Sequence, residues 1–167
     1  MRWFLLSLAL MACTQKRLNR LSPAEFDHYY ALRVFMDEDA RRDYLRLQTE
    51  EERNDYLQTA ELWDNFYQYE PHIRDLIVAG DVQVGWSKEM LVMSWGRPYD
   101  VNRQAGRDAV RSELLVYRFE RHDDGNGRYD LVWEPNSKTE YRAIGFFRKE
   151  VIIDDDVVAE IREREGW

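Results

Sequence analysis

The chain has 167 residues, of which 34% are charged and 14% are aromatic, and its formal net charge is −8. A strongly acidic protein repels phosphate backbones, which excludes nucleic acid as an expected partner. Three histidines and one cysteine leave little material for a metal centre and none for an intramolecular disulfide. The length suits one domain with a hydrophobic core rather than two.

The first twelve residues have the layout of a secretory signal. Arg2 precedes an apolar run over residues 3–12, and a polar stretch begins at Thr14. The run has about half of the roughly 20 apolar residues that a membrane span requires. Leu10-Met11-Ala12-Cys13 resembles the lipobox of bacterial lipoproteins, which implies cleavage before Cys13 and acylation of its sulfur and its new amine. Such acyl chains exceed the two signals that stable membrane anchoring needs.

Three other interpretations of this segment are an ordinary cleaved signal, a membrane-spanning helix and an apolar helix of a cytosolic protein. The lipoprotein interpretation places the chain on a membrane surface outside the cytoplasm. Thr14 follows Cys13 where an Asp would direct retention in enteric bacteria, so the resemblance implies the periplasmic face of the outer membrane. Removal of residues 1–12 deletes Arg2 and changes the net charge from −8 to −9.

Helix signals dominate residues 22–79, which follow a predicted tether over residues 13–21. Ser22-Pro23-Ala24-Glu25 forms a capping box with proline at the first helical position, and Thr49-Glu50-Glu51-Glu52 forms a second box. Apolar residues at helical spacing follow each box. The predicted helices cover residues 22–34, 37–47, 49–63 and 72–79.

Residues 80–167 change from helical to extended patterns. Ser87 caps a helix that ends at Gly96, and Pro98 prevents its continuation. The predicted strands cover residues 114–120 and 129–134, with a hairpin turn at 123–127, and one bent or two separate strands over 141–148 and 150–153. Residues 157–164 are predicted as a short charged helix. This order predicts an α+β fold, with helices packed on an antiparallel meander of three to four strands, and residues 22–167 as one domain.

These segments resemble two bacterial envelope families. Gly85-Trp86-Ser87-Lys88-Glu89-Met90, Trp95-Gly96-Arg97-Pro98 and Leu115-Val116-Tyr117 resemble the small outer-membrane assembly lipoproteins of the BamE/SmpA/OmlA type, over about residues 80–153. The segment from Leu45 through Arg53 to Leu62-Trp63 resembles the helical half of GWxTD-domain proteins, although Lys88-Glu89 stands where that family has Thr-Asp. Both resemblances imply an envelope-associated module without catalytic activity.

No residue pattern points to catalysis, a cofactor or a metal. His28, His72 and His122 lack ligand spacing, and His28 is expected to pack within an aromatic helix. No serine lies in a Gly-x-Ser-x-Gly context. Two acidic clusters, at 123–127 and 154–156, have oxygen ligands suited to calcium. Turn chemistry, or a helix N-terminus in the second cluster, explains them without a metal.

Aromatic residues are the main functional lead, because Trp, Tyr and Arg dominate binding hot spots. The candidate partner-binding residues are Trp63, Trp86, Trp95, Arg97 and Tyr99, and a second candidate surface is a sheet edge near 141–147 that would pair with a partner strand. The sequence therefore predicts a lipid-anchored periplasmic accessory protein or scaffold that binds other envelope proteins, in its most specific form during outer-membrane assembly. A module that binds a cell-wall fragment and an inhibitor of a periplasmic enzyme are the alternatives.

Overall fold

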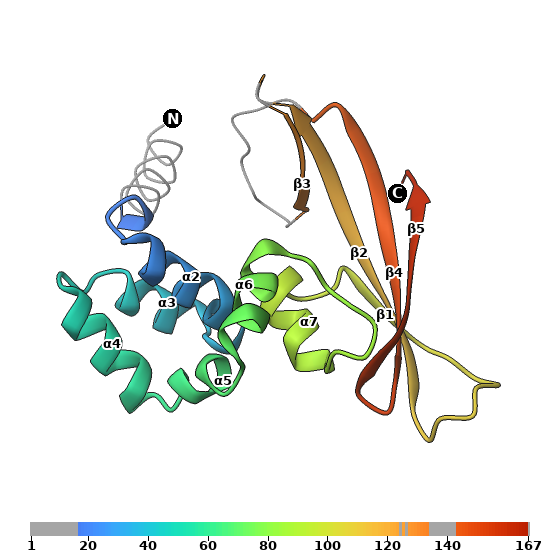
Figure 1. Ribbon diagram of the computed structural model, residues 1–167, viewed down its shortest axis with the longest axis horizontal. Helices are drawn as coiled ribbons and strands as arrows, with labels where there is room; N and C mark the ends of the chain where they lie inside the picture. The colour runs from blue at the N-terminus through green and yellow to red at the C-terminus, as the bar shows by residue number, and fades with distance from the viewer. Residues whose placement is uncertain (1–16, 124, 126, 134–142, 167) are drawn as a thin grey trace, which may run out of the picture. The chain divides into compact units, whose positions relative to one another are not determined.

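The computed structural model describes residues 17–123, 125, 127–133 and 143–166 (Figure 1). The predicted signal, Cys13 and most of the predicted tether lie outside these residues. The chain divides between Ala79 and Gly80 into two compact units. We call them the helical unit and the sheet unit. The division falls where the sequence changes from helical to extended patterns.

The helical unit consists of short helices whose starts agree with the sequence. Its elements are α2 (Pro23–Leu32), the 3-10 helix η1 (Arg33–Phe35), α3 (Glu38–Tyr44), α4 (Glu50–Thr59), α5 (Trp63–Tyr67) and α6 (Pro71–Ala79). Both predicted capping boxes are present, at Ser22 and at Thr49. Each box satisfies backbone N–H groups that a helix start otherwise leaves without partners, which fixes where α2 and α4 begin.

One predicted helix is broken in two. α4 ends at Thr59 instead of continuing to Trp63, because Glu61 adopts a left-handed conformation with φ 56°. The N–H of Leu62 donates to the carbonyl of Leu57 at 2.9 Å, and the N–H of Glu61 donates to that of Gln58 at 3.0 Å. This is the Schellman pattern of helix ends, which normally uses glycine at the left-handed position. Because Glu61 occupies this position instead of a glycine, the sequence did not indicate that the helix ends here.

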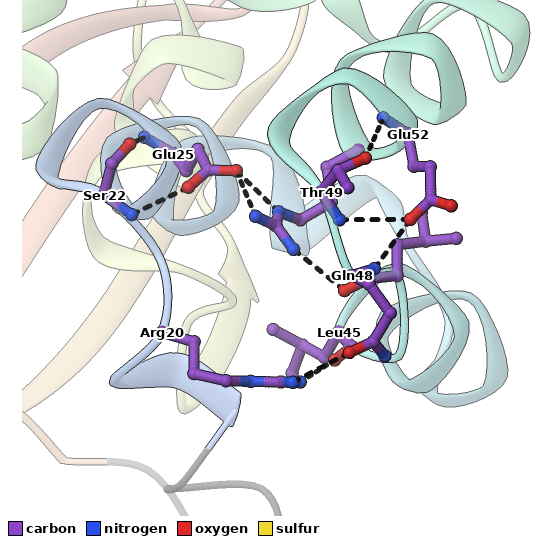
Figure 2. Close-up of polar contacts among 9 residues, drawn as sticks. Arg20, Ser22, Glu25, Leu45, Gln48, Thr49 and Glu52 are labelled. Atoms are coloured by element: carbon purple, nitrogen blue, oxygen red, sulfur yellow. Dashed lines mark hydrogen bonds and ion pairs between the residues drawn. The ribbon is translucent and has the colours of Figure 1, made fainter.

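The interior of the helical unit contains a buried ion pair between α2 and α4. Glu25 Oε1 accepts from Nε of Arg53 at 2.6 Å, and the two residues are 2% and 6% exposed. Glu25 also closes the capping box by accepting from the N–H of Ser22 at 2.7 Å (Figure 2). Arg53 donates a further bond to the carbonyl of Leu47 at 2.8 Å. One carboxylate therefore ties the start of α2 to α4.

The end of the predicted tether belongs to this unit. Arg17 and Leu18 are helical, and the guanidinium of Arg20 donates to Oε1 of Gln48 at 3.1 Å. A second bond reaches the carbonyl of Leu45 at 3.5 Å (Figure 2). Arg20 is thus held on the helical unit rather than standing in a solvated spacer.

The sheet unit confirms the α+β fold, with helices first and an antiparallel sheet after them. It contains α7 (Lys88–Trp95), β1 (Asp100–Arg103), β2 (Ser112–Asp123), β3 (Arg128–Val132), β4 (Gly145–Asp154) and β5 (Val157–Glu165). The strand order is β1-β2-β4-β5, with β3 also paired to β2. The sheet is therefore not the predicted meander of three to four strands, since β1 and β3 both lie on one side of β2 (Figure 1).

The core of the sheet unit lies between α7 and one face of the sheet. Alternate residues of β2, Leu115, Tyr117 and Phe119, are at most 4% exposed. The indole of Trp95 on α7 meets the rings of Tyr117 and Phe119 edge-on, with both centroid distances at 5.3 Å. Ser87 caps α7 as predicted, and Gly96, with φ 79°, ends it. The two-residue period of β2 thus places its large apolar side chains under α7.

The tail predicted as a charged helix is a strand. β4 and β5 are joined by Asp155 and Asp156, whose φ values of 47° and 66° are left-handed. Two left-handed residues in succession make the tight turn that matches the twist of a hairpin, and aspartate tolerates this conformation better than most residues. Val157 and Val158 then favour extended backbone because they are β-branched. The many charged residues of the tail are therefore those of an exposed edge strand and not those of a helix surface.

The predicted sheet edge near 141–147 is not an edge. Residues 141 and 142 lie outside the described part, and residues 145–154 form one strand, β4, which lies between β2 and β5. Phe147 pairs with Phe119 of β2 on one side and with Glu165 of β5 on the other. Both sides of β4 are therefore already paired at Phe147, and no partner strand can add at that residue.

Candidate functional site

The five predicted partner-binding residues occupy different environments. Trp86 and Trp95 are 6% and 3% exposed, so they belong to the core and their assignment to a contact surface is wrong. The cause is that α7, which Trp86 precedes and Trp95 ends, is buried along most of its length. Trp63 lies in the helical unit, half-buried and stacked on Tyr67 at 4.2 Å. Arg97 and Tyr99 are exposed.

Tyr99 lies at an interruption in one side of β2. β1 begins at Asp100, opposite Val116, and β3 ends at Val132, opposite Phe119. The two strands therefore face each other end to end along β2. The N–H of Tyr99 donates to the carbonyl of Val116 at 2.8 Å. Sheet pairing thus fixes the backbone on the β1 side of the interruption.

Trp133 reaches the same place from the other side. Its N–H donates to the carbonyl of Arg118 at 2.8 Å. The rings of Tyr99 and Trp133 meet at an angle of 63°, with their centroids 5.7 Å apart. The guanidinium carbon of Arg118 lies 3.5 Å from the centroid of the Tyr99 ring and 5.7 Å from that of Trp133. We call Tyr99, Arg118 and Trp133 the edge cluster.

Exposed apolar side chains extend the edge cluster along the same face of the sheet. Glu120 follows Arg118 by two positions on β2, and it pairs with Leu131 of β3 and Phe146 of β4. Residues two apart on a strand share a face. Leu131 is 43% exposed and Phe146 is 47% exposed. We call the edge cluster together with Leu131 and Phe146 the edge patch.

Ion pairs border the edge patch on β4 and β5. Arg148 donates to Glu150 at 3.0 Å, and Arg164 lies 3.6 Å from the other oxygen of Glu150. Arg148 pairs with Arg118 in the register of β2 and β4, which puts this network beside the edge cluster. An exposed aromatic and apolar centre with a charged border is the usual composition of a protein-binding surface.

Sequence reasoning found Tyr99 but missed Arg118, Trp133 and Leu131, and it included Phe146 only as part of the proposed sheet edge near 141–147. The available signal for Arg118 was its position on the polar side of an alternating strand, which indicates only a solvent-facing residue. Trp133 lies near the end of a predicted strand, but nothing in the sequence aligns it with Tyr99. Their meeting depends on two separate registers on β2, which no local pattern encodes.

His28 and His122 have structural partners. His28 is 7% exposed, and its Nε2 pairs with the hydroxyl of Tyr67, as expected for a packing residue. Nε2 of His122 pairs with Glu120 at 3.2 Å. In the described part of the chain, no three His, Cys, Asp or Glu side chains are grouped so as to hold a metal ion.

The second acidic cluster is a turn, not the predicted alternative of a helix N-terminus. The fork of Arg107 holds Asp154, with Nε–O distances of 2.9 Å. Asp155 accepts from the N–H of Arg111 at 2.9 Å. In the first cluster Asp123 accepts from the N–H of Gly125 at 2.9 Å, while residues 124 and 126 lie outside the described part. Side-chain and backbone donors therefore already engage these carboxylates.

Burial of His28 makes the stability of the helical unit depend on pH. Burial lowers the pKa of His28 below 6.5, because the protonated ring is poorly solvated among Trp63, Phe66 and Tyr67. The unfolded chain therefore takes up a proton near its ordinary pKa while the folded chain does not. The contribution of His28 to the free energy of unfolding is fully present above the pKa of the unfolded chain. It is lost as the pH falls from that pKa to the pKa of the folded chain, by about 1.4 kcal/mol for each pH unit between the two.

Urea denaturation of the full chain at about pH 7.5 and about pH 5.5 measures this loss. The His28→Phe variant removes the titrating group and should flatten the difference between the two pH values. His72→Asn, a change at an exposed histidine, should leave the difference as in the wild-type chain. An equal pH effect in all three proteins would show that His28 is not its source.

None of the helices within the described ranges has both the length and the apolar character needed to cross a membrane. A scan against protein-family models and searches of curated proteins and of solved structures found no match to the chain.

Proposed function

We propose that the protein is a lipid-anchored periplasmic accessory protein that binds other envelope proteins through the edge patch. The observation that carries the proposal is the placement of Arg118 against Tyr99 and Trp133, beside the exposed side chains of Leu131 and Phe146. The lipid anchor rests on Leu10-Met11-Ala12-Cys13. Outer-membrane assembly is the finer version of the proposal and rests on the resemblance of residues 80–153 to assembly lipoproteins.

The edge cluster suits protein recognition because its side chains are positioned before a partner arrives. Tyrosine and tryptophan have few rotatable bonds, so they lose little entropy on binding. Arg118 is held over the Tyr99 ring, which supports its guanidinium and fixes its position. The three residue types are those that dominate binding hot spots.

The edge cluster suits a sugar ligand less well. A carbohydrate stacks on an open aromatic face, whereas Arg118 lies over one face of Tyr99 at 3.5 Å. Glycoside chemistry needs two carboxylates close together. Among the described residues that line the cavity of Arg103 and Arg111, the carboxylate is that of Glu113. These features favour a protein partner over a cell-wall fragment.

Site-specific photocrosslinking in cells tests the proposed surface. A photoreactive phenylalanine analogue is placed at Tyr99 or Phe146, and at Val110 as a control, since Val110 is 94% exposed in the same unit. We expect adducts with envelope proteins from Tyr99 and Phe146 that are absent from Val110. Equal adducts from all three positions, or none from Tyr99 and Phe146, would contradict the proposal.

Loss of a central arginine measures the contribution of the edge cluster. The Arg118→Gln variant removes the charge stacked on Tyr99 and should reduce recovery of the same partner about 30-fold if Arg118 is a hot spot worth about 2 kcal/mol. Arg162→Gln changes a charge on β5 whose ion-pair partner is Glu160, and it serves as the matched control. Equal recovery with both variants would remove Arg118 from the binding surface.

The anchor is tested separately by mass spectrometry of the N-terminus. We expect a mature chain that starts at Cys13 with acyl groups, and release of the Cys13→Ala variant from the membrane fraction. A chain that begins at Met1 would contradict the anchor without bearing on the edge patch.

A further inference from the structure

A cluster of cationic side chains lies at the other end of β2. Arg103 of β1 pairs with Glu113 of β2 in the register of the sheet, so their side chains share the face that α7 covers. Lys88, the first residue of α7, donates to Oε2 of Glu113. Arg111 donates to Oε1 of the same carboxylate at 2.7 Å. Three cations thus gather around one carboxylate.

The β4–β5 turn holds the segment that carries Arg111. Asp155 accepts from the N–H groups of Val110 and Arg111, at 3.3 and 2.9 Å, and its own N–H donates to the carbonyl of Arg111 at 2.9 Å. Arg107 donates to the carboxylate of Asp154 through Nε and Nη2, the latter at 2.6 Å. The N–H of Lys88 donates to the carbonyl of Asp156 at 2.8 Å. The β4–β5 turn therefore holds both the backbone that carries Arg111 and the start of α7 that carries Lys88.

The negative charge of Glu113 is almost fully balanced by its cationic neighbours inside this cluster. It is 9% exposed, and hydrogen bonds from Lys88 and Arg111 hold its pKa below 4.5. Both of its oxygens are occupied by donors. Its single negative charge therefore balances one positive charge, that of Lys88 or that of Arg111. The positive charge of Arg103 has no counter-charge from Glu113.

Arg103, Arg111 and Glu113 line an open cavity of about 300 Å³. Arg103 is exposed, and its side chain makes no hydrogen bond or ion pair with any residue in the described part of the chain. Arg111 keeps a 60% exposed side chain while its terminal nitrogen bonds to Glu113. Two guanidiniums therefore border one cavity in a protein whose net charge is −8.

We propose that this cavity, the arginine cavity, binds a phosphate group, either free or as a terminal monoester. The planar fork of a guanidinium matches the oxygens of phosphate and forms charge-assisted hydrogen bonds with them. Arg111 is already positioned by Glu113, and Arg103 completes the pair from the neighbouring strand. The site lies on the α7 face of the sheet, opposite to the face of Arg118, and does not depend on the proposed protein-binding surface.

Calorimetric titration of the full chain in detergent with inorganic phosphate, at constant ionic strength, tests the arginine cavity. We expect saturable binding that weakens at least about tenfold in Arg103→Gln, since one charge-assisted bond contributes 1.4 kcal/mol or more. The Arg103 side chain has no hydrogen bond or ion pair to lose among the described residues, so this variant should unfold close to the temperature of the wild-type chain. Arg162→Gln removes one charge from β5 and should bind phosphate within about twofold of the wild type.

The same titration with glycerol 3-phosphate distinguishes the two sources of the group. Tighter binding of the ester, lost in Arg103→Gln, identifies a monoester such as a lipid headgroup, and tighter binding of inorganic phosphate identifies the free ion. Absence of saturation by both ligands up to on the order of 10 mM would overturn the proposal. Equal weakening in Arg103→Gln and Arg162→Gln would overturn it as well, because it would show a general charge effect.

Discussion

Replacement of Arg53 by leucine is expected to lower the free energy of unfolding of the helical unit by about 3–5 kcal/mol, because it leaves a buried carboxylate without its counter-charge. Glu25 is 2% exposed and its pKa reflects two opposed effects. Burial raises the pKa, while hydrogen bonds from Arg53 and Ser22 bring it below 4.5. Without Arg53 the first effect remains, and the carboxylate must stay charged in the core or take up a proton.

The loss should extend to the helix start that Glu25 closes. The same carboxylate accepts from the N–H of Ser22, and its protonation weakens that bond. Arg53 also satisfies the carbonyl of Leu47, which precedes the capping box at Thr49. Arg53→Leu therefore disturbs the starts of both α2 and α4, whereas a typical exposed arginine would affect neither.

Urea denaturation followed by far-ultraviolet circular dichroism measures this effect. Arg46→Leu is the matched control, because Arg46 pairs with Asp43 at 3.1 Å with both side chains about 60% exposed. That variant should cost less than about 0.5 kcal/mol. The double variant Glu25→Leu with Arg53→Leu should recover most of the loss, since it removes both charges. An equal loss in the single and double variants would show that packing, not charge, dominates the Arg53 effect.

Replacement of Trp95 by alanine is expected to lower the free energy of unfolding of the sheet unit by about 3–5 kcal/mol. Trp95 is 3% exposed, and its ring fills the space between α7 and β2 against Tyr117 and Phe119. Its Nε1 donates to the carbonyl of Gly80 at 2.9 Å. The ammonium of Lys149 lies 5.0 Å from the ring centroid. Alanine would remove all of these contacts and leave a cavity.

Two further variants separate these contributions. Trp95→Phe keeps an aromatic ring but loses the bond to Gly80, so it should cost less than alanine. Val101→Ala, at a residue that is 48% exposed on β1, should cost less than about 1 kcal/mol. If urea gives two transitions, Trp95→Ala should move one and Arg53→Leu the other. Movement of the same transition by both variants would mean that the two units unfold together.

The sequence predicted what depends on local chemistry. Ser22, Thr49 and Ser87 each cap a helix where their side chains indicated, because a cap needs only residues within one turn. Gly96 ended α7 for the same reason. The order of helices and strands, and therefore the α+β class, followed from these signals together with the change of period after Gly80.

Features set by distant pairing or by an unusual backbone were missed. β1 has the sequence Asp-Val-Asn-Arg, with all four residues exposed, so it carries no apolar alternation and exists because β2 lies beside it. Glu61 and the pair Asp155-Asp156 take left-handed conformations without glycine. The tail after Asp156 has the charge of a helix surface, and only its pairing with β4 makes it a strand.

The candidate sites divide in the same way. Tyr99 was predicted to lie on a surface rich in tryptophan and tyrosine. Trp86 and Trp95 were assigned to the same surface, because the sequence does not show which aromatic residues belong to the core. Arg118 and Arg103 act in two different clusters on opposite faces of the sheet. Each depends on the register of β2, which joins segments far apart in the chain.

The interruption beside the edge cluster also divides β2 into two regions of unequal protection. β4 covers one side of β2 from Ser112 to Arg121, whereas the other side is covered by β1 opposite residues 113–116 and by β3 opposite residues 119–123. Each short strand can therefore unpair without forcing the other to do so, and without breaking the ladder between β2 and β4. Small, independent openings of this kind make such elements the first to exchange their amide hydrogens with solvent. We therefore expect the sheet to combine a persistent three-stranded centre of β2, β4 and β5 with a border of two short strands that exchange faster than the centre.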